Sequence, residues 1–518
     1  RNYYQDKYYG IDQNQHDKRR FSTYSNGMEL PTEENPSDPV FKKYEEFKSF
    51  TVSDWLEGIN TLVKSKSDQI AICTYSDDNV DIIRHESQAH GLPYWPYVSS
   101  DNVNNTSHSN PNHIVSNASI QQISFKSRYN AVEPEEIAIR LYENIANGSG
   151  LDISTMGDFR DYEDERNYEM IETIFAHHKN FEPYYGKYRS VSEILIISPQ
   201  FWPGGESAEE YRGIQLMLKE AHIPFDIIEK SKIEVLHQKI KRYRVIILPE
   251  TDYLTEGAID VLKETVNQGT QLIATNRSLS HHPEALEQIF GAKVIDNNYN
   301  GSGNYVAPEN KNIFKSFDKQ SMLFWEYNLG QYDFSGATER FLPILAKGRP
   351  GPPEKIGGHD LTGYYGMGVK QHSRSKAVLL PINIGRLYYL KGYEQHKNIL
   401  LDVLDYVYPE SKDIIKTNAH PRIETVLKNY TLNTPENANK TTDDGKILHL
   451  VNLTGFGGTS YFNYLPVFNV DFTIKSDFEP SSIFSMGTEE YIEFTWDKGY
   501  IHFVVPVIGQ YEGLVIKM

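Results

Sequence analysis

Short apolar runs alternate with amphipathic segments through the first third of the chain. Residues 38–66 carry apolar side chains at helical spacing, among them Phe47, Trp55 and Ile59, and predict a helix. The runs "DQIAICTYS", "HIVSNASIQQI" and "GLDISTMGDF" predict strands. A helix is expected within residues 133–150, where Pro134 suits the first turn and Gly148 the stop, and another in "NYEMIETIFAHHKNFEPYY". Such alternation indicates a parallel sheet or a barrel.

A second series of the same kind begins near Ser190. The runs "EILIIS", "PFDIIEK", "YRVIILPE", "TQLIATN" and "KAVLLPIN" are strand-sized, and amphipathic segments such as "EGAIDVLKETVNQG" separate them. Five strands bounded by helices predict a flavodoxin-like doubly wound sheet. The glycine- and proline-rich stretch "GRPGPPEKIGGHDLTGYYGMG" is interpreted as a long loop inside this sheet.

From residue 411 onward the apolar period changes to two. "YIEFTWDKGYIHFVVPV" alternates apolar and polar residues on both sides of an Asp-Lys-Gly turn, which is typical of an antiparallel hairpin. With "KILHLVNLTG", "VFNVDFTIK" and "LVIKM" it predicts a small β-sandwich. The expected fold is therefore α/β with a C-terminal antiparallel part, and we place the domain boundaries at 1–187, 188–410 and 411–518.

Composition narrows the classes of protein. Lys and Arg number 52 and Asp and Glu 70, so the net charge is −18, which disfavours binding to nucleic acid. No apolar run is long enough for a membrane helix. A single cysteine, Cys73, permits neither an internal disulfide nor a Cys-based zinc site. The first residues lack the apolar core of a signal peptide and do not begin with Met, so the compartment stays open, with periplasm or secretion slightly favoured.

One stretch combines charge with aromatic side chains. "NVDIIRHESQAHGLPYWPYVSSDN" places Glu86 between Arg84 and His85 on one side and Trp95 and Tyr97 on the other. Glu86 is either a loop carboxylate paired with Arg84 or a backbone amide, or an acid beside a surface on which a sugar ring stacks. Aromatic burial would raise the pKa of such an acid and Arg84 would lower it, so the direction stays open.

The chain resembles bacterial glycoside hydrolases with a catalytic (β/α)₈ barrel, a glutamine-amidotransferase-like trimerisation domain and a small β-domain. Glycoside hydrolase family 42 is the nearest named architecture, and the barrel segments resemble a related group near the alpha-L-fucosidases. The resemblance rests on "YYGIDQNQHDKRRFSTYSNGMELPTEENPSDPVFKKYEEF", "RHESQAHGLPYWPYVSSDN", "NGSGLDISTMGDF" and "FEPYYGKYRSVSEILIIS". It implies an enzyme that cleaves terminal sugars with two carboxyl groups.

The resemblance and the position of Glu86 after a strand make it the candidate general acid. Asp77 and Asp158 are candidates for the second carboxylate, although each is also typical of a turn or helix cap. The candidate sugar-binding residues are Arg84, His85, Trp95, Tyr97, Asp101 and Asn117. The amidotransferase-like domain lacks a cysteine nucleophile at "QLIATNRSLS", so its role is expected to be structural, in a homo-oligomer that is a dimer or trimer.

Two departures from the family qualify these expectations. Asp12, Asn14 and Asp17 stand where relatives often carry a cysteine cluster, so we expect no structural zinc, and no other metal or cofactor is implied. Only four barrel strands are expected, and the resemblance implies that the others come from a longer protein or a separate partner. A noncatalytic carbohydrate-binding or assembly protein with a degenerate barrel is the alternative function.

Overall fold

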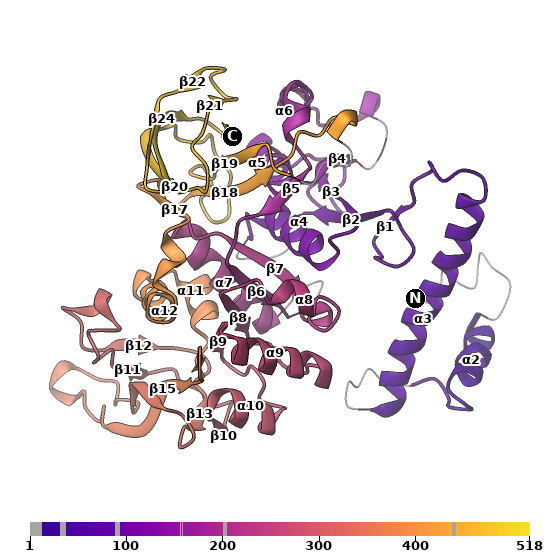
Figure 1. Cartoon of the computed structure of the whole chain (residues 1–518). Helices are drawn as coiled ribbons and strands as arrows, with labels where there is room; N and C mark the ends of the chain where they lie inside the picture. The colour runs from indigo at the N-terminus through magenta and orange to yellow at the C-terminus, as the bar shows by residue number, and fades with distance from the viewer. Residues whose placement is uncertain are drawn as a thin grey trace. The chain divides into compact units, whose positions relative to one another are not determined.

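The structure is a computed structural model that describes residues 13–31, 38–88, 94–155, 157, 159–199, 205–437 and 442–518. The chain forms two compact units (Figure 1). The smaller contains residues 1–84 and 112–114, and the larger contains residues 85–111 and 115–518. None of the described helices is long and apolar enough to cross a membrane.

The smaller unit is built around a helix pair. Its elements are α2 (Gln13–Tyr24), α3 (Pro39–Lys64) and β1 (Cys73–Thr74). The predicted helix over residues 38–66 is confirmed, because the Asp38 side chain accepts from the Val40 amide and starts α3. The buried strand expected over residues 68–76 is wrong. Only β1 forms there, and Cys73 is exposed, since its segment lies beside α3 with little cover.

The larger unit begins with alternating strands and helices. They are β2 (Ile82–Ser87, whose last three residues belong to this unit), α4 (Val98–Ser109), β3 (Ile114–Ile120), α5 (Pro134–Asn147), β4 (Gly150–Ser154) and α6 (Tyr168–Phe181). Strands β3 and β4 pair in parallel from Ser116 and Gly150 onward. Helix α5 begins at Pro134 and ends at Gly148, whose φ of 97° is left-handed, as the sequence predicts.

A nine-stranded sheet follows, and its parallel part has the order β7-β6-β8-β9-β16. These strands are β6 (Ile194–Ser198), β7 (Phe225–Glu229), β8 (Val245–Pro249), β9 (Gln271–Thr275) and β16 (Lys376–Leu380). The helices between and after them are α7 (Gly205–Glu220), α8 (His237–Ile240), α9 (Glu256–Gln268), α10 (Pro283–Phe290), α11 (Ile384–Lys391) and α12 (Glu394–Val407). All five predicted strands are present because each is mainly apolar and buried on both faces, with Asp226 of β7 as a buried charged exception.

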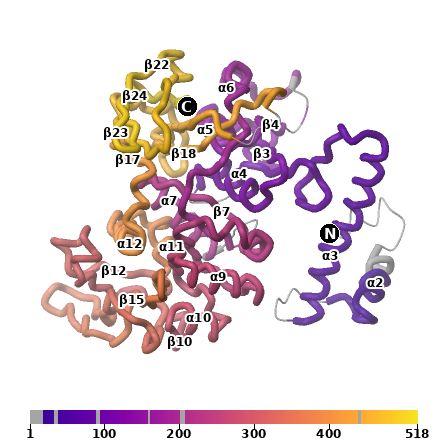
Figure 2. Tube along the Cα trace, viewed as in Figure 1, coloured from indigo at the N-terminus to yellow at the C-terminus, as the bar shows by residue number. Residues whose placement is uncertain are grey.

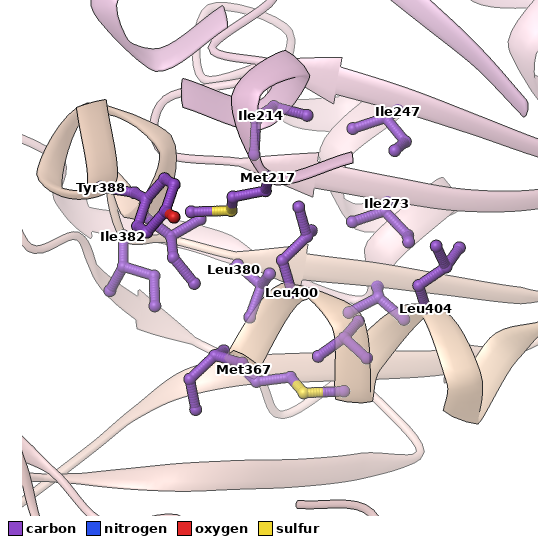
Figure 3. Close-up of a cluster of buried hydrophobic side chains, with 14 of the residues drawn as sticks. Ile214, Met217, Ile247, Ile273, Met367, Leu380, Ile382, Tyr388, Leu400 and Leu404 are labelled. Atoms are coloured by element: carbon purple, nitrogen blue, oxygen red, sulfur yellow. The ribbon is translucent and has the colours of Figure 1, made fainter. Parts of the chain in front are cut away.

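Both faces of this sheet carry an apolar core. On one face, Ile214 and Met217 of α7 and Leu400 and Leu404 of α12 meet sheet residues such as Ile273 (Figure 3). On the other face, α9 and α10 cover Leu248, Leu272 and Leu379. The sheet is thus fixed from both sides, and the carboxyl ends of its parallel strands share one edge.

The same sheet continues in an antiparallel direction that the sequence did not predict. The added strands are β15 (Leu361–Gln371), β14 (Glu339–Leu345), β11 (Asn304–Val306) and β12 (Leu323–Trp325), with a separate pair of β10 (Lys293–Asp296) and β13 (Gln331–Asp333). The stretch 348–368, interpreted as a loop, therefore ends in strand from Leu361 onward. Glycines interrupt the alternation of apolar and polar residues that would identify this strand in the sequence. Gly368 cannot carry a side chain because the Phe334 ring lies against it.

The C-terminal segment, coloured orange to yellow in Figure 2, forms two antiparallel sheets that share one core. One sheet contains β17 (Ile415–Thr417), β20 (Val467–Lys475), β24 (Tyr500–Ile508) and β23 (Phe494–Asp497). The other contains β22 (Tyr491–Ile492), β21 (Ser482–Ser485), β25 (Tyr511–Lys517), β19 (Gly445–Asn452), β18 (Ile423–Tyr430) and β5 (Tyr188–Ser190). The predicted hairpin turn is present, with Lys498 and Gly499 at positive φ. Because β5 pairs with β18, residues 188–190 join this sheet, and the expected boundary after 187 stays a prediction.

Candidate functional site

Glu86 lies on strand β2 and not in the loop that the sequence suggested. Burial alternates along the strand, so His85 and Ser87 are buried while Glu86 is half-buried. Burial lowers the pKa of His85 to about 4, which keeps its imidazole neutral at pH 7. Glu86 is the penultimate residue of the strand, and its side chain therefore stands at the carboxyl end of a parallel strand.

A network of amide side chains fixes this end of β2. Asn102 of α4 donates to the Glu86 carbonyl at 2.9 Å and to Asn117 Oδ1 at 3.1 Å. Asn117 of β3 donates in turn to Ser87 Oγ at 2.8 Å and to Asn144 Oδ1 at 2.7 Å. Asn117 is fully buried with its polar atoms engaged by the protein. Asn117 thus joins β2, β3 and α5 in the interior, and the sugar contact predicted for it stays a prediction.

The predicted aromatic platform is buried. Trp95 and Tyr97 lie in one core cluster with ring centroids 5.2 Å apart, and Tyr389 of α11 packs on Trp95 at 5.9 Å. The Lys219 ammonium stands 4.8 Å from the centre of the Tyr97 ring. Tyr97 has no exposed surface, and burial raises the pKa of its hydroxyl. A sugar ring cannot stack on it here, because the chain turns into α4 and presses both rings against the neighbouring helices.

Asp101 also turns inward. It lies in the first turn of α4, where it accepts a hydrogen bond from the Tyr211 hydroxyl of α7. Its side chain is buried, and the loss of water raises the pKa of the carboxyl group. Asp101 therefore joins α4 to α7 and does not reach a substrate in this structure.

The remaining predicted residues divide between the two units. Arg84 and Asp77 belong to the smaller unit, where both are half-buried, Arg84 on β2 and Asp77 in the loop after β1. Asp158 lies outside the described residues. The identity of the second carboxylate therefore stays a prediction. Among the described residues, no group of three or more His, Cys, Asp or Glu side chains is placed to hold a metal ion.

Sequence reasoning missed a buried ionic cluster behind the site. Glu143 of α5 accepts the backbone amides of Ser99 and Ser100 at 3.1 Å each, so a carboxylate lies at the amino end of α4. Glu424 of β18 accepts from the Ser100 hydroxyl at 2.7 Å and pairs with Lys219 of α7. Burial, followed by the charge of Glu424, raises the pKa of Glu143 well above its usual range. The sequence indicates this cluster only through Glu143, a glutamate inside the apolar run "IAIRLYENIA".

Comparisons with known proteins give the class of fold. No protein-family model matches the chain, and no curated protein matches its sequence. Solved structures do match. The alpha-L-fucosidase isoenzyme 2 from Paenibacillus thiaminolyticus has a TM-score of 0.69 at 14% identity, over 96% of this chain and 74% of that one.

Two beta-galactosidases are also similar. A catalytic mutant of a GH42 beta-galactosidase from G. stearothermophilus gives a TM-score of 0.62 at 13% identity, over 99% of this chain and 75% of that one. The beta-galactosidase from Bacillus circulans sp. alkalophilus gives a TM-score of 0.58 at 10% identity, over 99% of this chain and 75% of that one. The chain is thus structurally similar to these glycoside hydrolases over nearly its whole length, as the sequence resemblance predicted.

Proposed function

We propose that the protein is a metal-independent glycoside hydrolase that removes terminal sugars from oligo- or polysaccharides, with fucosidase-like or galactosidase-like specificity. In this proposal β1 to β4 are C-terminal strands of a (β/α)₈ barrel. The nine-stranded sheet forms a flavodoxin-like, amidotransferase-like domain, and the two C-terminal sheets form a β-sandwich. The similarity of fold to a fucosidase and to GH42 galactosidases supports this reading. We expect the molecule to assemble as a homo-dimer or homo-trimer.

The position of Glu86 carries the proposal. In barrel enzymes, catalytic groups stand at the carboxyl ends of strands, and Glu86 is the last residue but one of β2. Asn102 holds its carbonyl, and Asn117 and Asn144 extend the support into β3 and α5. A carboxyl group on so firmly held a strand can protonate a glycosidic oxygen without moving its backbone. Asp77 or Asp158 would supply the second carboxylate.

Replacing Glu86 by Gln tests this role. If Glu86 donates the proton, Glu86→Gln lowers kcat on an aryl glycoside with a poor leaving group by about 10²- to 10⁴-fold. The loss should shrink for a dinitrophenyl glycoside, whose leaving group needs no proton. Initial rates on aryl alpha-L-fucosides and beta-D-galactosides of graded leaving-group pKa measure this difference.

Glu172→Gln is the matched control, because Glu172 is exposed on α6 and the chemical change is identical. Equal losses on every leaving group would mean that Glu86 positions the substrate without protonating it. Full activity of Glu86→Gln would remove the assignment.

A noncatalytic carbohydrate-binding or assembly protein is the second candidate. The burial of Trp95, Tyr97 and Asp101 favours it, because three predicted sugar contacts serve the core. It predicts that the wild-type chain binds saccharides and hydrolyses none of the aryl glycosides.

A further inference from the structure

A cavity of about 310 Å³ lies at the carboxyl edge of the nine-stranded sheet. Its lining includes Pro199 after β6, Lys230 after β7, Glu250, Asp252 and Tyr253 after β8, and Arg277 and His281 after β9. The chain order β7-β6-β8 reverses direction at β6, so the cavity lies at the topological switch point of the sheet. Open α/β sheets bind small ligands at this place.

Opposite charges in the walls are paired within the protein. Arg277 Nε donates to Glu250 Oε1 at 2.8 Å, and His281 Nδ1 lies 2.5 Å from Asp252 Oδ2. Lys230 Nζ donates to the Asp252 carbonyl at 3.1 Å. The charges of Arg277 and Lys230 balance those of Glu250 and Asp252. A neutral ligand leaves this balance and the Arg277–Glu250 pair intact.

Glu250 contributes an acceptor that the protein does not use. Its side chain is 4% exposed, and its Oε2 has no hydrogen-bond partner among the described residues. A buried carboxylate oxygen without a donor is unfavourable unless a ligand or water supplies one. The backbone of Glu250 also has a φ of +46°, which is strained for a residue with a side chain and is a feature that clusters at functional sites.

A second carboxylate lies behind Glu250. Glu210 of α7 is fully buried, and its Oε1 also has no hydrogen-bond partner among the described residues. Burial, with a contribution from the charge of Glu250, raises the pKa of Glu210 to about 7. Glu210 does not itself line the cavity, so Glu250 Oε2 is the acceptor there, and it calls for a ligand with an O–H or N–H donor.

The lining of the cavity also carries an aromatic side chain. Tyr253 is 68% exposed and stacks on His281 with ring centroids 4.2 Å apart. Its backbone φ of +54° is strained as well, so the fold holds an exposed ring at an unfavourable conformation. A ring face and a carboxylate acceptor in one cavity suit a polyhydroxylated ring, which offers C–H groups to the aromatic ring and hydroxyl donors to the carboxylate.

We propose that this cavity binds a monosaccharide, as a neutral polyhydroxylated ring, at a site on a different sheet from Glu86. Glu250 Oε2 accepts a hydrogen bond from a sugar hydroxyl, and the Tyr253 ring packs against one face of the sugar. The volume is at the lower end of the range for small-molecule sites, so one sugar ring fits and an oligosaccharide does not. The site is independent of hydrolysis at Glu86 and would exist in a noncatalytic protein as well.

Calorimetric titration of the full chain with D-galactose, L-fucose and D-glucose tests the proposal, with L-glutamine as a zwitterionic probe of similar size. At least one sugar is expected to bind. Tyr253→Ala and Glu250→Gln should each weaken that binding by about tenfold or more, since Gln keeps an oxygen for Arg277 but replaces the free acceptor by a donor. Tyr491→Ala, at an equally exposed tyrosine on β22, should leave it unchanged.

Unfolding temperatures of the variants show whether each is folded, and Tyr253→Ala removes an exposed ring with little risk to the core. Sugar binding that is lost in Glu86→Gln and unchanged in both cavity variants would overturn the proposal by placing the sugar at Glu86. Binding of L-glutamine in preference to all three sugars would overturn the ligand class. Absence of any sugar binding would overturn the site.

Discussion

A carboxyl group that is removed from water must find other donors or keep its proton. Glu512 on β25 is 2% exposed and accepts from Ser485 Oγ at 3.0 Å and the Gly487 amide at 3.1 Å. These bonds do not replace its hydration, and burial raises the pKa of Glu512 to about 7. Between pH 4.5 and 7 the folded protein therefore binds more protons than the unfolded chain, so stability falls as the pH rises.

Glu512→Gln should remove this fall in folding stability between pH 4.5 and 7. A carboxamide resembles the protonated acid, so the variant and the wild type should be about equally stable at pH 5. At pH 8 the variant should be more stable by about 2–3 kcal/mol, from 1.4 kcal/mol for each unit of pKa. Urea unfolding at a series of pH values measures the difference. Glu490→Gln, at an exposed glutamate, should follow the wild type, and parallel pH profiles for Glu512→Gln and wild type would contradict the prediction.

At the residue scale, sequence reasoning selected Glu86 as a candidate but did not predict its surroundings. The carboxylate was selected because it follows apolar residues near an aromatic cluster. The direction of the aromatic side chains depends on what α4 packs against, and α7 and α11 lie more than a hundred residues further along the chain. A local pattern cannot contain that information. Glu250 directly follows "VIILP", so the same rule that selected Glu86 would have selected it.

At the scale of elements, α4 protects the edge of the nine-stranded sheet. Strand β7 is the last strand on its side, so the outer amides and carbonyls of β7 need partners. Asn104 of α4 donates to the Phe225 carbonyl at 3.1 Å and accepts from the Ile227 amide at 2.9 Å. Ser109 accepts from the Glu229 amide at 2.9 Å. Side chains of a helix thus take the place of a further strand.

Asn104→Leu removes the two hydrogen bonds that Asn104 makes with β7 and therefore tests their contribution to stability. The change leaves the Phe225 carbonyl and the Ile227 amide buried without partners, at a cost of about 3 kcal/mol. We expect a lower unfolding temperature and more aggregation on heating, measured by scanning calorimetry and light scattering. Asn180→Leu, at an exposed position of α6, is the control for the added apolar side chain. Equal stability of Asn104→Leu and the control would contradict the role of Asn104.

The elements that were predicted have an apolar pattern that is visible in the local sequence, and those that were missed do not. Strands β6 to β9 and β16 are buried on both faces, and their sequences are mainly apolar, although β7 contains the buried Asp226. Helix α4 was missed because "VSSDNVNNTSHS" is rich in Ser and Asn, which disfavour helices in isolation. The same side chains stabilise α4 through bonds to β7 and β18, partners that local periodicity does not reveal. Strand β15 was missed because its glycines interrupt the apolar pattern.

At the scale of the whole molecule, the two units differ in how much core they contain. The buried apolar side chains described in the smaller unit are Phe21, Phe47, Leu56, Val80 and Ile83. The larger unit holds separate apolar cores on both faces of its nine-stranded sheet and between its C-terminal sheets. Because stability grows with buried apolar area, the smaller unit is expected to open at a lower free energy.

One large-to-small core substitution in each unit tests whether the two units unfold independently. Phe47→Ala should remove about 3–5 kcal/mol from the smaller unit, and Ile273→Ala about 2–5 kcal/mol from the larger. Phe47 packs on Phe21 at 5.5 Å, and Ile273 lies in the sheet core (Figure 3). Hydrogen exchange should then show that Phe47→Ala accelerates peptides of α2 and α3 and leaves β6 to β9 unchanged. Ile273→Ala should accelerate the sheet, and since unfolding of the larger unit is the main transition, it alone should lower the main unfolding temperature. If Phe47→Ala lowered that temperature equally, the chain would unfold as one cooperative body.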